Sequence, residues 1–528
     1  MRISRILALT CLFSAFASCT KDFEEINRNP FSPTQTDIGP LFNTVIDSTR
    51  LGWNEQFYLH NETLYDITQQ AVKTGVGFAN ITIGTEEVWA FYYRSLAHIR
   101  EIERRLDAMD IEPEALNNVR AQLKVLLAYK TFRLTDLFGD IPFTDAGRGF
   151  ESLDYARPKF DDQESIYKFL LEELKWVEEH INTFPNPTTA GGTPYLSIGS
   201  FDTFLGGDMM RWRKFANSLR LRHAMRMVEK DPAFATPILK DIIENNLPVI
   251  KPGEEVVMLP KQQDWVNESV NWSFAEHKKL RMGSNVWHQL SESDSKDGSG
   301  IFDPRARIFF ETNNAKEWAP YPQLPDANTP AEGGIPYERH RDFNYDIKGA
   351  DCLYSPFNYY LIRDDQTIPE IILTAAEVQF IKAEAYLRGL GVAASSSDAE
   401  IAYTDGLVAS IKFWQGIVTG SAIWANQPPI LTEGQIFAAT AHPRLNIFTS
   451  TDKLQMIYTQ QWLDAFRQPW EAYALWRRTG ATPREGTPPV YYRFAYPPSE
   501  ATNNPEHWAE QVAKMGEDSP AVKVWWMK

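Results

Sequence analysis

Apolar residues recur every three or four positions along most of this sequence, and this spacing constrains the fold more than any other feature. Such a period is typical of amphipathic α-helices, and proline or glycine marks where they begin or end. The spacing predicts helices near 114–138, 162–182 and 211–229, after Pro232, from Pro369 to Leu387, from 454 to just before Pro469, and from Pro469 to Arg478. One short strand is expected at 256–259, and no repeat of fixed period is visible. We therefore predict an all-α fold.

The helical spacing fades between about residues 247 and 368, where Pro, Gly, Trp and Tyr become dense. Long loops inside a helical body are uncommon unless they carry a function. We therefore expect one compact body over residues 38–528, with a loop-rich region at about 247–368 that contacts a ligand or a partner.

Composition excludes several classes of protein. Of the 528 residues 43% are hydrophobic and 23% are charged, which is the balance of a globular protein and not of a disordered chain. The formal charge is −16, and the sequence contains no basic run that could neutralise phosphates, so we predict no binding to nucleic acid. An acidic chain with 16 Trp, 21 Tyr and 31 Phe is typical of an envelope protein that meets neutral ligands.

The N-terminus reads as an export signal. Arg2 and Arg5 precede an apolar stretch that is too short to span a bilayer, and small residues lead directly to Cys19. We interpret residues 1–18 as a lipoprotein signal peptide, Cys19 as the lipidated first residue of the mature chain, and 19–37 as a polar tether. Plain secretion with cleavage near Cys19 is the alternative. Loss of Arg2 and Arg5 with the signal takes the formal charge from −16 to −18.

Cysteine usage leaves no disulfide. Cys11 leaves with the signal and Cys19 is acylated, so Cys352 is alone in the mature chain. A single thiol forms neither an intramolecular disulfide nor a zinc site. We interpret Cys352 as an inert, small side chain.

Seven segments, in order along the chain, match the motifs of one family. They are residues 19–30, 135–143 (TDLFGDIPF), 212–226 (WRKFANSLRLRHAMR), 375–385 (AAEVQFIKAEA), 461–480, 493–497 (RFAYP) and the closing pair at 525–526. The chain resembles the SusD/RagB family of outer-membrane lipoproteins of Bacteroidota, specifically its SusD-like branch, over essentially the whole mature sequence.

This resemblance implies a fold of tetratricopeptide-like helix pairs decorated by irregular loops. It implies a nutrient-binding protein, not an enzyme, lipid-anchored through Cys19 in the outer membrane and exposed at the cell surface. It further implies capture of an oligosaccharide, or in some members a peptide, and delivery to a TonB-dependent SusC-like transporter. No cofactor is implied.

The charged residues of the motifs lie on or beside predicted helices with apolar neighbours. Unpaired buried charges are costly, so we expect these residues to pair with one another and to fix helix packing. They are Asp136, Asp140, Arg220, Arg222, Arg226, Glu377, Glu384, Glu471, Arg477 and Arg478.

No recognised catalytic or metal motif is present, so we predict no catalytic residues and no metal. His277 and His288 are the nearest histidine pair in the loop region, and the stretch from Asp294 to Asp303 only loosely resembles a calcium loop, because its closing glutamate is missing. A helical-barrel glycoside hydrolase of the envelope is the alternative function, since such enzymes are also acidic and rich in aromatic residues.

Aromatic residues of the loops are the candidate ligand contacts. Sugars present flat C–H faces that stack on aromatic rings, and their hydroxyl groups need polar partners. The candidate residues are Trp265, Asn271, Trp272, Trp318, Tyr321 and Tyr354, with a second set at Trp53 and Phe78. Exposed aromatic residues also mark protein interfaces, so a transporter interface and plain packing remain open as alternatives.

Overall fold

The computed structural model describes residues 37–74, 80–258, 280–333, 352–362, 368–422, 424 and 426–528. The long helices are α3 (Ile38–Asp47), α5 (Ile81–Asp107), α6 (Asn117–Phe138), α7 (Gln163–His180), α8 (Met209–Met227), α9 (Pro232–Glu244), α14 (Ala375–Arg388), α15 (Ser396–Gly420), α17 (Lys453–Asp464), α18 (Pro469–Thr479) and α20 (Pro505–Met515). Shorter helices are α4 (Tyr65–Thr68), α11 (Ser284–His288), α12 (Ala306–Phe309), α13 (Tyr359–Ile362), α16 (Glu433–Ala439) and α19 (Pro498–Asn503). A π-helix, η1 (Glu55–Leu64), precedes α4, and isolated 3-10 turns complete the helical elements.

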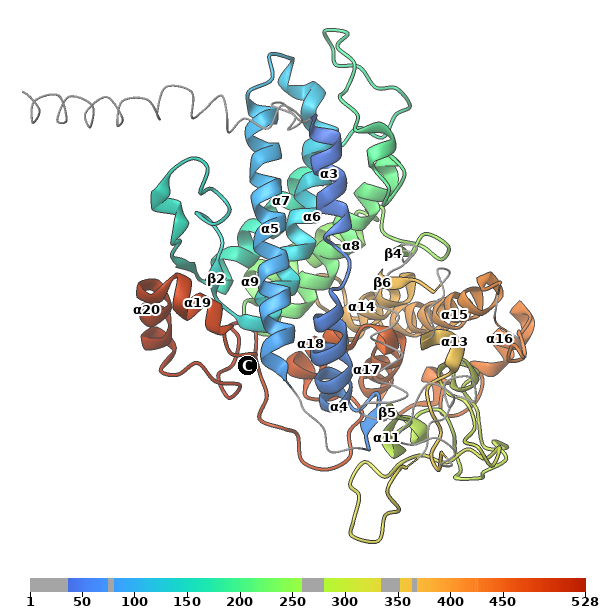
Figure 1. Cartoon of the computed structure of the whole chain (residues 1–528). Helices are drawn as coiled ribbons and strands as arrows, with labels where there is room; N and C mark the ends of the chain where they lie inside the picture. The colour runs from blue at the N-terminus through green and yellow to red at the C-terminus, as the bar shows by residue number, and fades with distance from the viewer. Residues whose placement is uncertain are drawn as a thin grey trace, which may run out of the picture.

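Helices pack in sequence order, which confirms the predicted all-α fold. Helix α6 packs on α5 and α7, α7 on α8, and α8 on α9, so the N-terminal helices lie side by side (Figure 1). A second group is formed by α14, α15, α17 and α18, and it joins the first group where α8 contacts α14 and α18.

The predicted helix boundaries agree with the structure where capping residues mark them. The side chain of Asp208 accepts hydrogen bonds from the backbone N–H groups of Met210 and Arg211 and so begins α8. Proline occupies the first position of α9 and of α18. Gly480 ends α18 with a φ of 63°, a left-handed conformation that glycine adopts without steric cost.

One predicted helix start is wrong. The residues after Pro369 form strand β6 (Glu370–Leu373), which pairs antiparallel with β4 (Val256–Met258), and helix α14 begins only at Ala375. Thr374 ends the strand and caps the helix, because its side chain accepts a hydrogen bond from the backbone N–H of Glu377. The short strand predicted at 256–259 is confirmed for Val256–Met258.

The described strands form three small two-stranded sheets. Besides β4–β6 these are β1 (Val72–Lys73) with β5 (Leu280–Arg281), and β2 (Ile141–Pro142) with β3 (Phe160–Asp161). Each is antiparallel and short, and each ties a loop back to the helical body.

The loop-rich region contributes to the same core as the helices. Phe309, Phe310 and Phe357 are fully buried and pack their rings around Phe466, which follows α17. Most buried apolar residues, from Ile38 to Met527, form one contiguous cluster, and Val72, Tyr321 and Tyr354 form a second, small one. None of the helices in the described ranges is both long enough and apolar enough to cross a membrane.

Candidate functional site

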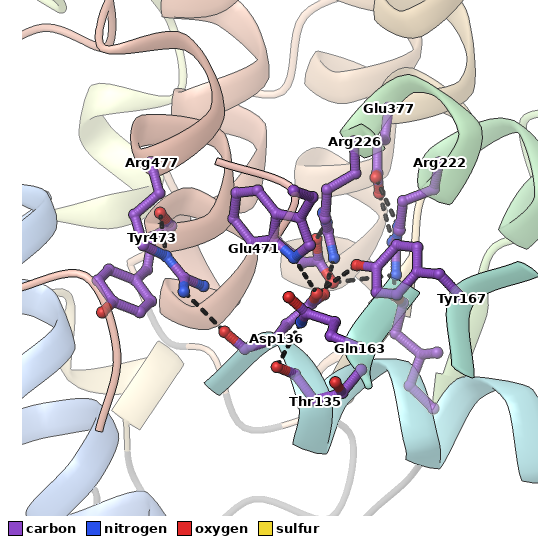
Figure 2. Close-up of polar contacts among 12 residues, drawn as sticks. Thr135, Asp136, Gln163, Tyr167, Arg222, Arg226, Glu377, Glu471, Tyr473 and Arg477 are labelled. Carbon is purple, nitrogen blue, oxygen red and sulfur yellow. Dashed lines mark hydrogen bonds and ion pairs between the residues drawn. The ribbon is translucent and has the colours of Figure 1, made fainter. Parts of the chain in front are cut away.

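The charged residues of the family motifs converge on Asp136, at the end of α6 (Figure 2). Its carboxylate accepts hydrogen bonds from Arg226 on α8, from the hydroxyl of Tyr167 on α7, and from the indole N–H of Trp526 at 2.8 Å. Arg226 also pairs with Glu471 on α18. Helices α6, α7 and α8 and the C-terminal segment therefore meet at the buried carboxylate of Asp136.

The cluster extends from Arg226 to its neighbour one turn earlier on α8. Arg222 pairs with Glu471 at 3.2 Å and binds both oxygens of Glu377, on α14, at 2.6 and 2.5 Å. Burial alone would raise the pKa of Glu471, but Arg222 and Arg226 outweigh it and hold the pKa below its ordinary value. Glu471 is thus held as a carboxylate between two guanidinium groups inside the protein.

This network fixes helix packing, as the sequence predicted. Glu384 pairs with Arg478 at 2.7 Å in the same way, so the expected mutual pairing is confirmed for seven of the ten motif charges: Asp136, Arg222, Arg226, Glu377, Glu384, Glu471 and Arg478. The other three bind elsewhere: Asp140 pairs with Lys514, Arg220 pairs with Asp241, and Arg477 donates to the main-chain carbonyls of Asp136 and Tyr492. The cavity beside the cluster measures about 30 Å³, which admits water but no sugar ring.

A partly exposed aromatic patch lies where α3 is followed by the π-helix η1. Trp53 stacks on Phe57 with ring centroids 4.9 Å apart and planes 9° apart, and Tyr58 meets both rings edge-on. Trp53 and Tyr58 are half-buried, whereas Phe57 is buried beneath them. We call Trp53, Phe57 and Tyr58 the aromatic patch.

A carboxylate on α5 holds the backbone of this patch in place. Glu87 accepts a hydrogen bond from the backbone N–H of Glu55 at 2.8 Å and from the side-chain amide of Asn54 at 3.1 Å. Gly52 lies so close to Glu87 that an added Cβ would stand 2.1 Å from its carboxylate oxygen. The helical backbone that carries Trp53 and leads into η1 is therefore held by α5, and π-helical turns such as η1 are frequent at functional sites.

Two strand pairings hold the described residues on either side of segment 259–279. Segment 259–279 carries Trp265, Asn271 and Trp272, and it starts after Met258, which pairs with Glu370. Glu370 accepts a hydrogen bond from the backbone N–H of Leu51 at 3.1 Å, two residues before Trp53. Leu280, directly after the segment, pairs with Lys73. Trp265, Asn271, Trp272 and Phe78 themselves lie outside the described residues, and their roles stay predictions.

The remaining aromatic candidates lie inside the fold. Trp318 is 5% exposed and stacks on Trp287 at 5.5 Å, and Tyr321 and Tyr354, 7% and 8% exposed, meet edge-on at 4.8 Å. The hydroxyl of Tyr354 donates a hydrogen bond to the carbonyl of Pro330. Stacking on a sugar requires an exposed ring face, so these three rings contact a ligand only if the loops around them open. Their role in binding stays a prediction.

Potential metal ligands in the loop region are paired within the protein. His288 contacts Asp294 and Glu485, and Asp303 binds Arg305 through both carboxylate oxygens. Among the residues that the structure describes, no three His, Cys, Asp or Glu side chains form a group that could hold a metal ion. His277 lies outside those residues.

Cys352 is buried, and burial raises the pKa of its thiol to about 11. The thiolate is the reactive form, so this cysteine is a poor nucleophile at neutral pH. The interpretation of Cys352 as an inert side chain fits this environment.

Comparison with known families and structures gives one consistent result. Residues 30–497 match the model of the SusD-like family described as "Starch-binding associating with outer membrane". No curated protein sequence matches the chain.

Solved structures share the fold over nearly the whole chain. A chitin-binding protein matches with a TM-score of 0.70 and 23% identity, covering 93% of this chain and 100% of its own. A SusD homologue from Parabacteroides distasonis matches with a TM-score of 0.69 and 20% identity, covering 93% and 98%. A chitin-binding SusD homologue from Flavobacterium johnsoniae matches with a TM-score of 0.61 and 20% identity, over the same shares of the two chains. At these identities the likeness establishes the fold alone.

Proposed function

Because this chain belongs to the SusD-like family of starch-binding proteins that associate with the outer membrane, we propose that it captures glycans at the cell surface. Two of the structures that share its fold are chitin-binding proteins, which supports a glycan as the class of ligand. The observation in this chain that carries the proposal is the aromatic patch, where the half-buried rings of Trp53 and Tyr58 lie on helical backbone that Glu87 holds in place.

The patch is suited to the apolar faces of sugar rings. A pyranose stacks its C–H face on an aromatic ring, and each such contact contributes roughly 1–2 kcal/mol, by analogy with aromatic pairs in interfaces. We propose that Trp265, Asn271 and Trp272, which lie outside the described residues, add two rings and an amide to these contacts.

Delivery to a transporter completes the proposed function. A surface protein that only binds a nutrient contributes to uptake when it passes the ligand to a pore. We propose that the partner is a TonB-dependent SusC-like transporter, and that acyl chains on Cys19 hold the protein in the outer membrane beside it. Co-purification of that transporter after mild detergent extraction tests the partnership, and recovery of the protein alone even after crosslinking would contradict it.

Binding and turnover separate the proposal from the alternative of a glycoside hydrolase. Isothermal titration with a panel of neutral oligosaccharides is expected to give saturable binding, which Trp53→Ala weakens about tenfold, equivalent to about 1.4 kcal/mol. The same mixtures, analysed after prolonged incubation, are expected to contain the oligosaccharides intact. Shortened products would establish a hydrolase instead.

A further inference from the structure

A polar cleft of about 530 Å³ crosses α5, α6 and α7, the neighbouring helices in the blue to cyan part of Figure 1. This volume is in the range of small-molecule sites, which is about 300–1,000 Å³. Neither the family motifs nor the sequence-predicted aromatic residues line it. The lining residues are Arg100, Glu103, Arg104, Leu106, Asp107, Arg120, Leu123, Lys124, Arg148, Glu151, Phe169 and Glu173.

Helical spacing brings these side chains to one surface. On α5 the charged positions 100, 103, 104 and 107 share a face, since residues three and four apart lie above one another. Positions 120, 123 and 124 of α6 and 169 and 173 of α7 do the same. Three helix faces and the loop that carries Arg148 and Glu151 therefore line the cleft.

The charges of the cleft are balanced in pairs. Arg100 pairs with Glu103 at 3.1 Å, and Lys124 on α6 pairs with Glu173 on α7. Arg120 with Asp107, Arg148 with Glu151, and Arg104 with the neighbouring Glu101 complete the set. An ionic ligand would find no uncompensated charge here, whereas a neutral ligand with many hydroxyl groups would find both donors and acceptors.

Arg100 fixes part of the wall of the cleft. The side chain of Arg100 is more than nine-tenths buried, and two of its nitrogens donate to Glu103 and to the carbonyl of Phe143. Its Nε–H has no acceptor among the described residues. This nitrogen is sealed from the cleft, so Arg100 contributes by fixing the carboxylate of Glu103, which lines the cleft, and the carbonyl of Phe143.

Exposed aromatic rings accompany the polar groups. Phe169 lines the cleft and is 44% exposed, and Phe150, 48% exposed, lies under the guanidinium of Arg104 at 5.9 Å. Trp176 follows Glu173 by one turn of α7, is half-buried, and has the Lys124 ammonium over its ring at 5.0 Å. Charged groups beside exposed rings suit a sugar, because the rings stack on C–H faces while carboxylates, guanidinium groups and ammonium groups bind hydroxyl groups.

We propose that this cleft is a second carbohydrate-binding site, which takes a neutral oligosaccharide on the helical side of the protein, separate from the aromatic patch. The class of ligand rests on the proposed function. Two sites on one chain would hold a long glycan at two points and so raise its effective affinity without new contacts at either site.

The test compares three sets of variants of the full chain by isothermal titration with maltohexaose, chitohexaose and other neutral hexasaccharides. Cleft variants are Phe169→Ala and the double change Lys124→Ala with Glu173→Ala. Matched controls are Phe184→Ala, a 77% exposed phenylalanine outside the cleft, and Lys175→Ala with Glu179→Ala, an exposed ion pair on the same helix. Each double change removes one charge of each sign. The third set carries Trp53→Ala with Tyr58→Ala, in the aromatic patch.

The wild type is expected to bind one of the sugars at two sites, and the patch variant is expected to retain one of them. The cleft variants should weaken that retained site at least tenfold with melting temperatures close to those of the controls. Binding that disappears in the patch variant and is unchanged in the cleft variants would overturn the second site and leave the proposed function intact. Absence of binding to every sugar by the wild type would overturn both.

Discussion

The indole N–H of Trp526 donates a hydrogen bond to a carboxylate oxygen of Asp136 at 2.8 Å, across 390 positions of sequence. Both side chains are buried, and the guanidinium of Arg477 lies over the ring of Trp526 at 4.8 Å. The C-terminal segment is therefore part of the core that α6, α8 and α18 build.

Trp526→Ala is expected to lower the free energy of unfolding by about 3–5 kcal/mol, because it removes a fully buried indole and leaves a cavity beside Asp136. Urea denaturation followed by circular dichroism measures this loss. Trp525→Ala, at a half-buried ring next in sequence, is the control and should cost clearly less. Equal losses in the two variants would contradict the buried role of Trp526.

Arg226→Met is expected to cost about 3–5 kcal/mol, because it leaves Asp136 and Glu471 buried without their shared cation. Arg120→Met removes a surface arginine whose pair with Asp107 is solvent-exposed, and it should cost less than about 1 kcal/mol. Denaturation midpoints of the two variants and the wild type measure these losses. A loss at Arg226→Met no larger than that at Arg120→Met would show that the network contributes little to stability.

Lys130 makes stability depend on pH. Burial, reinforced by the neighbouring Arg133, lowers the pKa of its ammonium to about 7, while Glu55, Glu370 and Asp47 act in the opposite direction. Between pH 7 and about 10.5 the folded state has released a proton that the unfolded state keeps, so stability rises with pH by at most about 1.4 kcal/mol per unit from this group. Below pH 7 both states are protonated, and the cost of the buried charge is fully present.

Lys130→Met should therefore stabilise the protein most below pH 7, and the gain should shrink as the pH approaches 10.5. Unfolding free energies of variant and wild type at pH 6, 8 and 10 give the profile. Lys175→Met, at an exposed lysine of α7, should show no such profile. A gain that is constant with pH would rule out the titration of Lys130.

Trp53 and Trp318 are expected to respond in opposite ways to alanine substitution. Trp318→Ala should lower the unfolding free energy by about 3–5 kcal/mol, because its ring is buried against Trp287. Trp53→Ala should weaken glycan binding about tenfold with a smaller loss of stability. Titration and thermal denaturation of both variants, extended to Trp265→Ala and Trp272→Ala, test all the sequence-predicted tryptophans together. Loss of affinity in Trp318→Ala at unchanged stability would place a ligand on that ring instead.

Cys19→Ala is expected to move the protein from the membrane fraction to the soluble fraction, because acylation requires the thiol. Two or more acyl chains anchor a protein durably, whereas one chain binds only marginally. Fractionation with immunoblotting measures the shift, and Cys11→Ala serves as the control that should stay with the membrane. A Cys19→Ala protein that remains fully membrane-bound would contradict the lipid anchor.

The sequence was most informative where a local signal marks an element. Pro232, Pro469 and Gly480 sit at the helix ends that they predict, because proline and glycine act on their own backbone. The helix start predicted at Pro369 is wrong because a tertiary contact determines the structure there. The residues after Pro369 pair with Val256–Met258, and no local pattern indicates a partner more than one hundred positions away.

The site was predictable only in part for a similar reason. The pairing of the motif charges could be predicted because their sequence neighbours are apolar. The identity of each partner, such as Asp136 for Arg226, could not, because it depends on how four helices meet. For Trp318, Tyr321 and Tyr354, irregular backbone gives no periodicity, so the sequence could not tell a buried ring from an exposed one. The cleft across α5 to α7 was not predicted, although the charged spacing at 100, 103, 104 and 107 is a signal of a shared face.

The contact between Asp136 and Trp526 also makes the core sensitive to the loss of a short piece of chain. Cleavage before Trp525 would remove a fully buried indole together with one of the three side-chain donors of a buried carboxylate. A buried charge that loses a partner is costly. Proteolysis at this one segment would therefore destabilise a helix that lies 390 positions away in the sequence.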